Sequence, residues 1–201
     1  MNNVQRYSEI QNLNLRSRAR NLALDYLSTI EGIFNSLRYF ERNRVHFLIL
    51  HHVFQDEAAG FGKLLEFLSK THEFVSYSEG VSRVLTGNID KPYIAISFDD
   101  GFKNNLKAGE ILNHHGISAC FFLNPNTIGL QDDPAMAAFC RSKLNIPTVE
   151  FLDWADVETL QTNGHEIGSH TMGHERLSLL KDEEIRKNMD ELNEKAKSDF
   201  K

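Results

Sequence analysis

Two groups of residues in this sequence have the types and the spacing of a chemical site. An apolar run at 93–98 leads directly into two adjacent carboxylates, Asp99 and Asp100. Further along, His170 and His174 follow another short apolar run and lie four residues apart. A carboxylate and two imidazoles offer one oxygen and two nitrogen ligands, a set that suits Zn²⁺ or a similar divalent ion. Together, the two groups predict one metal site.

Each group alone has a plainer interpretation. Adjacent aspartates at the end of a strand often form a turn or cap a helix, because their side chains bond to nearby backbone N–H groups. Two histidines four residues apart are often a solvated or capping pair. The metal-site interpretation therefore depends on the two groups meeting in one fold.

The segments that must position these residues alternate between two patterns from Val45 onward. Short apolar runs predict strands near 45–50, 74–77, 93–98, 119–123 and 166–169. Helical spacing predicts helices at 61–70, 78–85, 107–115, 153–163 and 181–197. This alternation is typical of parallel βα units. Functional groups in such folds gather at the carboxyl ends of the strands, where both groups fall.

Residues 10–40 have apolar positions at the spacing of one helical face, which predicts an amphipathic helix. Arginines flank it, so it could dock on the rest of the chain, on a second copy or on an anionic membrane surface. Docking on protein is favoured, because the charges do not gather on one dense polar face. We therefore expect an N-terminal helical extension at 1–44 and a second region at 45–201.

Composition excludes several classes of function. The chain of 201 residues has a formal net charge of −6, which argues against a nucleic-acid-binding protein. Cys120 and Cys140 are the only cysteines and lack C-x-x-C spacing, so neither a zinc knuckle nor a disulfide scaffold is indicated. The apolar runs are far shorter than the roughly 20 residues of a transmembrane helix. The N-terminus lacks the apolar core of a secretory signal, so we expect a cytoplasmic protein.

Several of these segments also carry a family resemblance. The stretch 97–101, Ser-Phe-Asp-Asp-Gly, resembles the T/S-F-D-D-G motif of the polysaccharide deacetylases with the NodB homology domain, carbohydrate esterase family 4. The stretch 170–174, His-Thr-Met-Gly-His, resembles their H-S/T-x-x-H motif, and 119–123 is similar to their A-T-F-F-like strand. Trp154 lies in the expected helix that leads to the histidine motif. The resemblance extends from about Val45 to the C-terminus.

This resemblance implies an α/β fold of the deformed (β/α) barrel type. Only five strands are predicted, fewer than the family's barrel needs. The family's R-x-x-P-type segment, which follows the histidine motif, has no counterpart here. We therefore expect an incomplete barrel, truncated on its C-terminal side, with the amphipathic helix before it.

The resemblance also implies roles for the site residues. Asp100, His170 and His174 would be the metal ligands, and Asp99 would be the general base. The family's general acid normally comes from a late L-x-H motif, which is absent after His174.

An L-x-H sequence does occur early, at the end of the first predicted strand, and some relatives have permuted motifs. His52 is therefore the first candidate acid and His51 the second. The alternative is that this pair only lines the mouth of the barrel.

These expectations add up to a metal-dependent hydrolase that removes acetyl groups from N-acetylated sugars or polysaccharide by cleaving a C–N bond. Zn²⁺ is the expected metal, with Co²⁺ or Ni²⁺ as alternatives. Two other functions stay open. One is a catalytically incompetent remnant that binds metal or carbohydrate. The other is a partner in polysaccharide synthesis that docks through the N-terminal helix.

Overall fold

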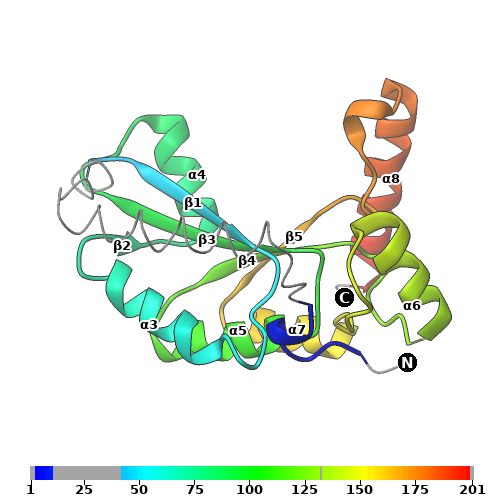
Figure 1. Cartoon of the computed structure of the whole chain (residues 1–201). Helices are drawn as coiled ribbons and strands as arrows, with labels where there is room; N and C mark the ends of the chain where they lie inside the picture. Colours follow the sequence, from blue (N-terminus) through cyan, green and yellow to red (C-terminus); the bar gives the residue numbers. More distant parts are fainter. Residues whose placement is uncertain (1–2, 11–41, 132, 200–201) are drawn as a thin grey trace.

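A parallel sheet lies at the centre of the fold (Figure 1). The computed structural model describes residues 3–10, 42–131 and 133–199. The strand order is β1-β3-β4-β5, and the short β2 pairs with the start of β3. The strands are β1 (Val45–Leu50), β2 (Glu73–Phe74), β3 (Tyr93–Asp99), β4 (Ala119–Leu123) and β5 (Glu166–Ser169). The predicted α/β class is confirmed, and the arrangement is consistent with a deformed (β/α) barrel.

Helices surround this sheet on both faces and at one end. Figure 1 shows α3, α5 and α7 along one face, α4 on the opposite face, and α6 and α8 beyond the end toward which the strands point. The helices are α1 (Tyr7–Ile10), α3 (Ala58–Leu68), α4 (Tyr77–Thr86), α5 (Asn105–His114), α6 (Asp133–Phe139), α7 (Trp154–Thr162) and α8 (Asp182–Asp199), with a π-helix at Cys140–Leu144 and a 3₁₀-helix at Leu177–Leu179. No helix in the described ranges is long and apolar enough to cross a membrane.

The alternation of side chains along β3 determines which face each residue meets. Ile94, Ile96 and Phe98 join the main core, in which the sheet packs against α3, α5 and α7. Tyr93 and Ala95 belong to a smaller cluster on the α4 face. Asp99 continues this second series, so β3 delivers it to the α4 side of the sheet.

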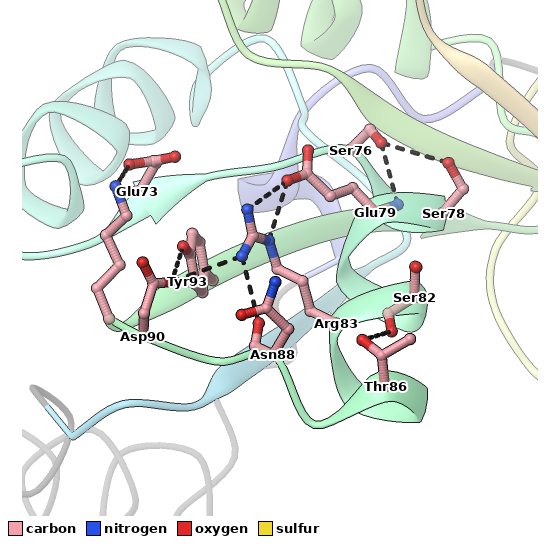
Figure 2. Close-up of polar contacts among 11 residues, drawn as sticks. Glu73, Ser76, Ser78, Glu79, Ser82, Arg83, Thr86, Asn88, Asp90 and Tyr93 are labelled. Atoms are coloured by element: carbon pink, nitrogen blue, oxygen red, sulfur yellow. Dashed lines mark hydrogen bonds and ion pairs between the residues drawn. The ribbon is translucent and has the colours of Figure 1, made fainter.

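A polar network anchors α4 to the β2–β3 region, as Figure 2 shows. The Arg83 guanidinium donates to Glu79 at 2.7 and 2.9 Å and lies 4.1 Å from the centroid of the Tyr93 ring. At the start of the helix, Ser78 donates from its backbone N–H and its hydroxyl to the Glu166 carboxylate of β5. These contacts link α4 to β3 and to β5.

The main differences between the predicted and the observed elements lie at 74–77 and at 133–144. The expected strand at 74–77 is wrong beyond Phe74, because Ser76 is the N-cap of α4 and its hydroxyl accepts from the Glu79 N–H. Helix α6 and the π-helix after it were not predicted. They place Met136 and Cys140 in a separate buried cluster with Phe102. The helix expected at 10–40 falls almost entirely outside the described residues.

Candidate metal centre

The ends of β3 and β5 bring the predicted ligands together. Asp100 directly follows β3, and His170 directly follows β5. Nε2 of His170 and Nε2 of His174 each lie 3.6 Å from Oδ1 of Asp100. One ligand atom from each of the three residues lies within 4.8 Å of the others. Two ligands bonded to zinc at about 2.0–2.1 Å with a tetrahedral angle would be about 3.3 Å apart, so each of the two Asp100–histidine distances needs only a small contraction.

The surroundings of Asp100 also fit a cation. Its side chain is buried, and Oδ1 has no hydrogen-bond partner in the structure. A buried carboxylate oxygen without a partner is unfavourable, since burial removes its hydration. Both imidazoles present Nε2 to this oxygen. A divalent ion would satisfy all three groups and keep a position open for water or substrate.

The backbone at this site adopts conformations that most residues avoid. Among the described residues with a side chain, only Asp100, Asn145, Thr171 and His174 have positive φ, and three of these four belong to the site. Left-handed conformations are costly for such residues and cluster at functional sites. At Gly101, φ is 70°, and a Cβ atom would lie 3.1 Å from two neighbouring side chains, so glycine is needed directly after the aspartates.

The segment 170–175, which we call the histidine loop, is held in place by the end of β4. The His170 N–H donates to the carbonyl of Leu123 at 2.7 Å. The side chain of Asn124 is fully buried, and its amide donates to the carbonyls of His170 and Thr171. Asn124 therefore fixes the backbone on both sides of the bond that joins His170 to the left-handed Thr171.

Two further polar residues support the same loop from its other side. The Glu175 carboxylate accepts from the Gly173 N–H at 2.8 Å and from the Asn188 amide at 3.3 Å. Burial alone would raise the pKa of Glu175, but the hydrogen bonds it accepts, with that from Gly173 the strongest, lower the pKa overall. Asn188 lies on α8 and also accepts from the Met172 N–H at 3.4 Å. No sequence motif indicated these residues, because their contacts depend on how α8 packs on the loop.

Asp99 lies beside the ligands without joining them. Burial raises the pKa of its carboxyl group, while the charges of His170 and His51 oppose that rise. A carboxylate with a raised pKa is a better proton acceptor at neutral pH than an ordinary aspartate.

The two candidate acids face different surroundings. The ring of His52 stacks on Phe54 with centroids 4.7 Å apart and lies 4.0 Å from Phe102. Asn104 contacts Nδ1 of His52 at 3.2 Å, and burial lowers the pKa of His52 to about 4. His52 is therefore neutral at pH 7 and packed against aromatic rings.

His51, in contrast, is exposed and lies on the Asp99 side of the sheet. The register of β1 with β3 pairs Leu50 with Phe98, and extending it by one residue puts His51 opposite Asp99. The charge of His51 acts on the Asp99 carboxyl group, which agrees with this placement.

Known proteins of similar fold share this architecture. IcaB from Ammonifex degensii is 17% identical with a TM-score of 0.63, and the match covers 80% of this chain and 71% of that protein. A polysaccharide deacetylase from Bacillus cereus is 18% identical with a TM-score of 0.54, covering 78% of this chain and 48% of the other. The Streptococcus pyogenes deacetylase PplD, in complex with acetate, is 17% identical with a TM-score of 0.53, covering 76% and 68%.

At these identities the structural likeness shows the fold, and this chain spans only about half of the Bacillus cereus protein. Comparison with curated proteins finds no significant match. The sequence model of the polysaccharide deacetylases, in contrast, matches residues 86–199, more than half of the chain. The chain therefore belongs to the polysaccharide deacetylase family.

Proposed function

We propose that this chain is a metal-dependent hydrolase that removes acetyl groups from N-acetylated sugars or polysaccharide by cleaving the amide C–N bond. The observation that carries the proposal is the group formed by Asp100, His170 and His174, in which a buried carboxylate oxygen without a hydrogen-bond partner faces two imidazole nitrogens. Membership of the polysaccharide deacetylase family supports the reaction type. Acetate, the product of this reaction, is also the molecule bound to the streptococcal PplD.

The ligand set supports Zn²⁺ as the metal, with Co²⁺ or Ni²⁺ as substitutes of similar preference. An ion held there would polarise the acetyl carbonyl and make a nearby water molecule more acidic. Asp99 would accept a proton from the attacking water as general base. The water oxygen would bond to the carbonyl carbon, and the C–N bond would then break.

The departing amine nitrogen needs a proton, and we propose that His51 supplies it. The extended register with Asp99 and the exposure of His51 support this choice over His52. His52 remains the second candidate, with a lowered pKa and aromatic packing that both disfavour proton donation at neutral pH. The products would be acetate and a free amino sugar.

We also propose that residues 45–201 form one domain. Although the family match begins at residue 86, β1 pairs with β3 along its full length, and its end carries His51. Association through the amphipathic helix expected at 10–40 is a separate proposal. Sedimentation of the chain with and without residues 11–41 would test that association.

Acetate release from N-acetylglucosamine oligomers tests the proposed reaction. We expect Asp99→Asn to lower kcat by about 10²–10⁴-fold while the metal stays bound, because only the proton acceptor is removed. Asp190→Asn, at an exposed position on α8, should match the wild type. Metal binding by a wild-type chain that releases no acetate from N-acetylated or O-acetylated oligomers would contradict the proposal and favour a binding remnant.

A further inference from the structure

The first described residues are hydrogen-bonded to loops far along the chain. Residues 3–8, which we call the N-terminal strap, are bonded to two loops. One is the β1–α3 loop at 51–57, which carries His51. The other, at 145–153, leads into α7. The blue segment in Figure 1 lies at this end of the molecule.

Hydrogen bonds attach the strap to the loop at 145–153. The Asn3 amide donates to the Glu150 carboxylate at 2.8 Å, and the Val4 N–H donates to the carbonyl of Thr148 at 3.1 Å. The side chain of Val4 packs against the buried cluster that contains Phe102.

The other end of the strap is bonded to the β1–α3 loop. The Gln55 N–H donates to the carbonyl of Gln5 at 3.3 Å. The Asp56 carboxylate accepts from the N–H groups of Tyr7 at 2.8 Å and Ser8 at 3.2 Å. Asp56 thus caps the short helix α1, and its pKa is lowered, chiefly by the bond from Tyr7.

Aromatic packing links these two attachments. Phe102 belongs to the buried cluster against which Val4 packs, and its ring lies 4.0 Å from that of His52. His52 stacks in turn on Phe54, next to Gln55. The strap and the His52–Phe54 stack therefore hold the β1–α3 loop from one side. On the other side, the extended register of β1 with β3 puts His51 opposite Asp99.

We propose that the N-terminal strap is a positioning element of the active site, which holds the β1–α3 loop so that His51 stays within reach of the reacting group. This inference rests on the proposed function, in which His51 is the proton donor. Among the described residues, no hydrogen bond or ion pair joins the strap to the three proposed metal ligands. Its loss should therefore weaken proton donation and leave metal binding intact.

Two substitutions remove the same contact from opposite sides. Asp56→Ala removes the acceptor. Tyr7→Pro removes a donor, and proline is tolerated in the first turn of a helix, where Tyr7 lies. We expect each to lower kcat for acetate release by about tenfold or more, since small displacements of a catalytic group are costly. KM and bound metal should stay near wild-type values.

The double variant provides an internal test. If both substitutions act through one hydrogen bond, the double variant should lose no more activity than Asp56→Ala alone. Asp190→Ala, which removes an exposed carboxylate on α8, is the matched control. A kcat equal to that of Asp190→Ala would overturn the proposal, and so would parallel losses of kcat and bound metal.

A second readout does not depend on activity. The histidine Cε1–H signal of His51 in the NMR spectrum, identified by its absence in His51→Gln, should shift or broaden in Asp56→Ala and in Tyr7→Pro. An unchanged signal in both would overturn the strap's positioning role. If the signal moves but the wild type releases no acetate, the strap positions His51 as inferred and the proposed function is what fails.

Discussion

Oδ1 of Asp100 lies 3.6 Å from Nε2 of His174, and both residues have left-handed backbones, with φ of 73° and 57°. Neither conformation is one that an aspartate or histidine adopts without cost. The strained backbone therefore occurs at two residues whose side chains point at each other, Asp100 at the end of β3 and His174 in the histidine loop. This coincidence is expected where a fold maintains strain to hold ligands in place.

Removing the buried support of the histidine loop should weaken metal binding. Asn124→Ala leaves the carbonyls of His170 and Thr171 without their amide donor. We expect a loss of about 10–100-fold in Zn²⁺ affinity, the usual effect of removing a residue that orients a ligand. Competition with a chromogenic chelator measures this. Asn113→Ala, exposed on α5, is the control, and equal affinities in the two variants would contradict the role of Asn124.

Two glycine substitutions should change stability in opposite directions. A Cβ at Gly168 on β5 would lie 2.5 Å from the ring of Phe122, so Gly168→Ala should destabilise the fold by about 1–3 kcal/mol. A Cβ at Gly60 on α3 meets nothing within 4 Å, so Gly60→Ala should stabilise it by about 0.5–1 kcal/mol. Urea unfolding compares the two. A Gly168→Ala variant as stable as the wild type would contradict the close packing of β5 on β4.

His52 should make stability depend on pH. Its pKa is lowered from 6.5 to about 4 in the folded chain, so between these values the unfolded chain binds a proton that the folded chain does not. Above pH 6.5, the neutral His52 contributes up to about 3 kcal/mol to the free energy of unfolding, and this contribution is lost as the pH falls toward 4.

His52→Phe should reduce this dependence because phenylalanine does not titrate and suits the aromatic contacts. The measurement is the urea midpoint of metal-free protein at pH 6.5 and pH 4.5, with exposed His114→Gln as control. Some dependence should remain, since burial also lowers the pKa of His165. An equal fall in the urea midpoint between pH 6.5 and pH 4.5 for His52→Phe and His114→Gln would contradict the prediction, because it would mean that His52 is not buried in its neutral form.

The two adjacent histidines should differ in catalysis. We expect His51→Gln to lower kcat for acetate release by about 10²–10⁴-fold with metal still bound, because it removes the proton donor. His52→Gln should have a smaller effect, through packing against Phe54 and Phe102 alone. Measuring kcat for both variants at matched metal content decides which histidine is the proton donor. A larger loss of kcat in His52→Gln would assign that role to His52 instead of His51.

The parts of this site that could be predicted from the sequence follow from strong local patterns. The apolar runs of β3, β4 and β5 predict parallel strands, and parallel strands bring their carboxyl ends to one edge. That pattern groups the aspartate pair with His170 and His174, whereas the choice of Asp100 as the ligand comes from the family resemblance. Alternation along β1 also distinguishes the two adjacent histidines. Val45 and Phe47 lie on the Tyr93 face, so His51 continues their series and His52 does not.

The remaining features depend on contacts between distant residues. The hydrogen bonds of Asn124, Glu175 and Asn188 form only when β4 and α8 pack around the histidine loop. The short helix α6 begins near Pro134 and has too few residues for a helical period to stand out. The strap joins residues 3–8 to loops far along the chain, which no local pattern indicates.

The metal content of the purified chain tests the central claim most directly. Wild-type protein, Asp100→Ala and His174→Ala would be purified in parallel, equilibrated with Zn²⁺, freed of excess ion and analysed by elemental mass spectrometry. The account predicts stoichiometric zinc in the wild type and its loss in both variants, with all three chains folded by circular dichroism. A folded wild type that binds no metal, or variants that retain it, would contradict the assignment of these residues as ligands.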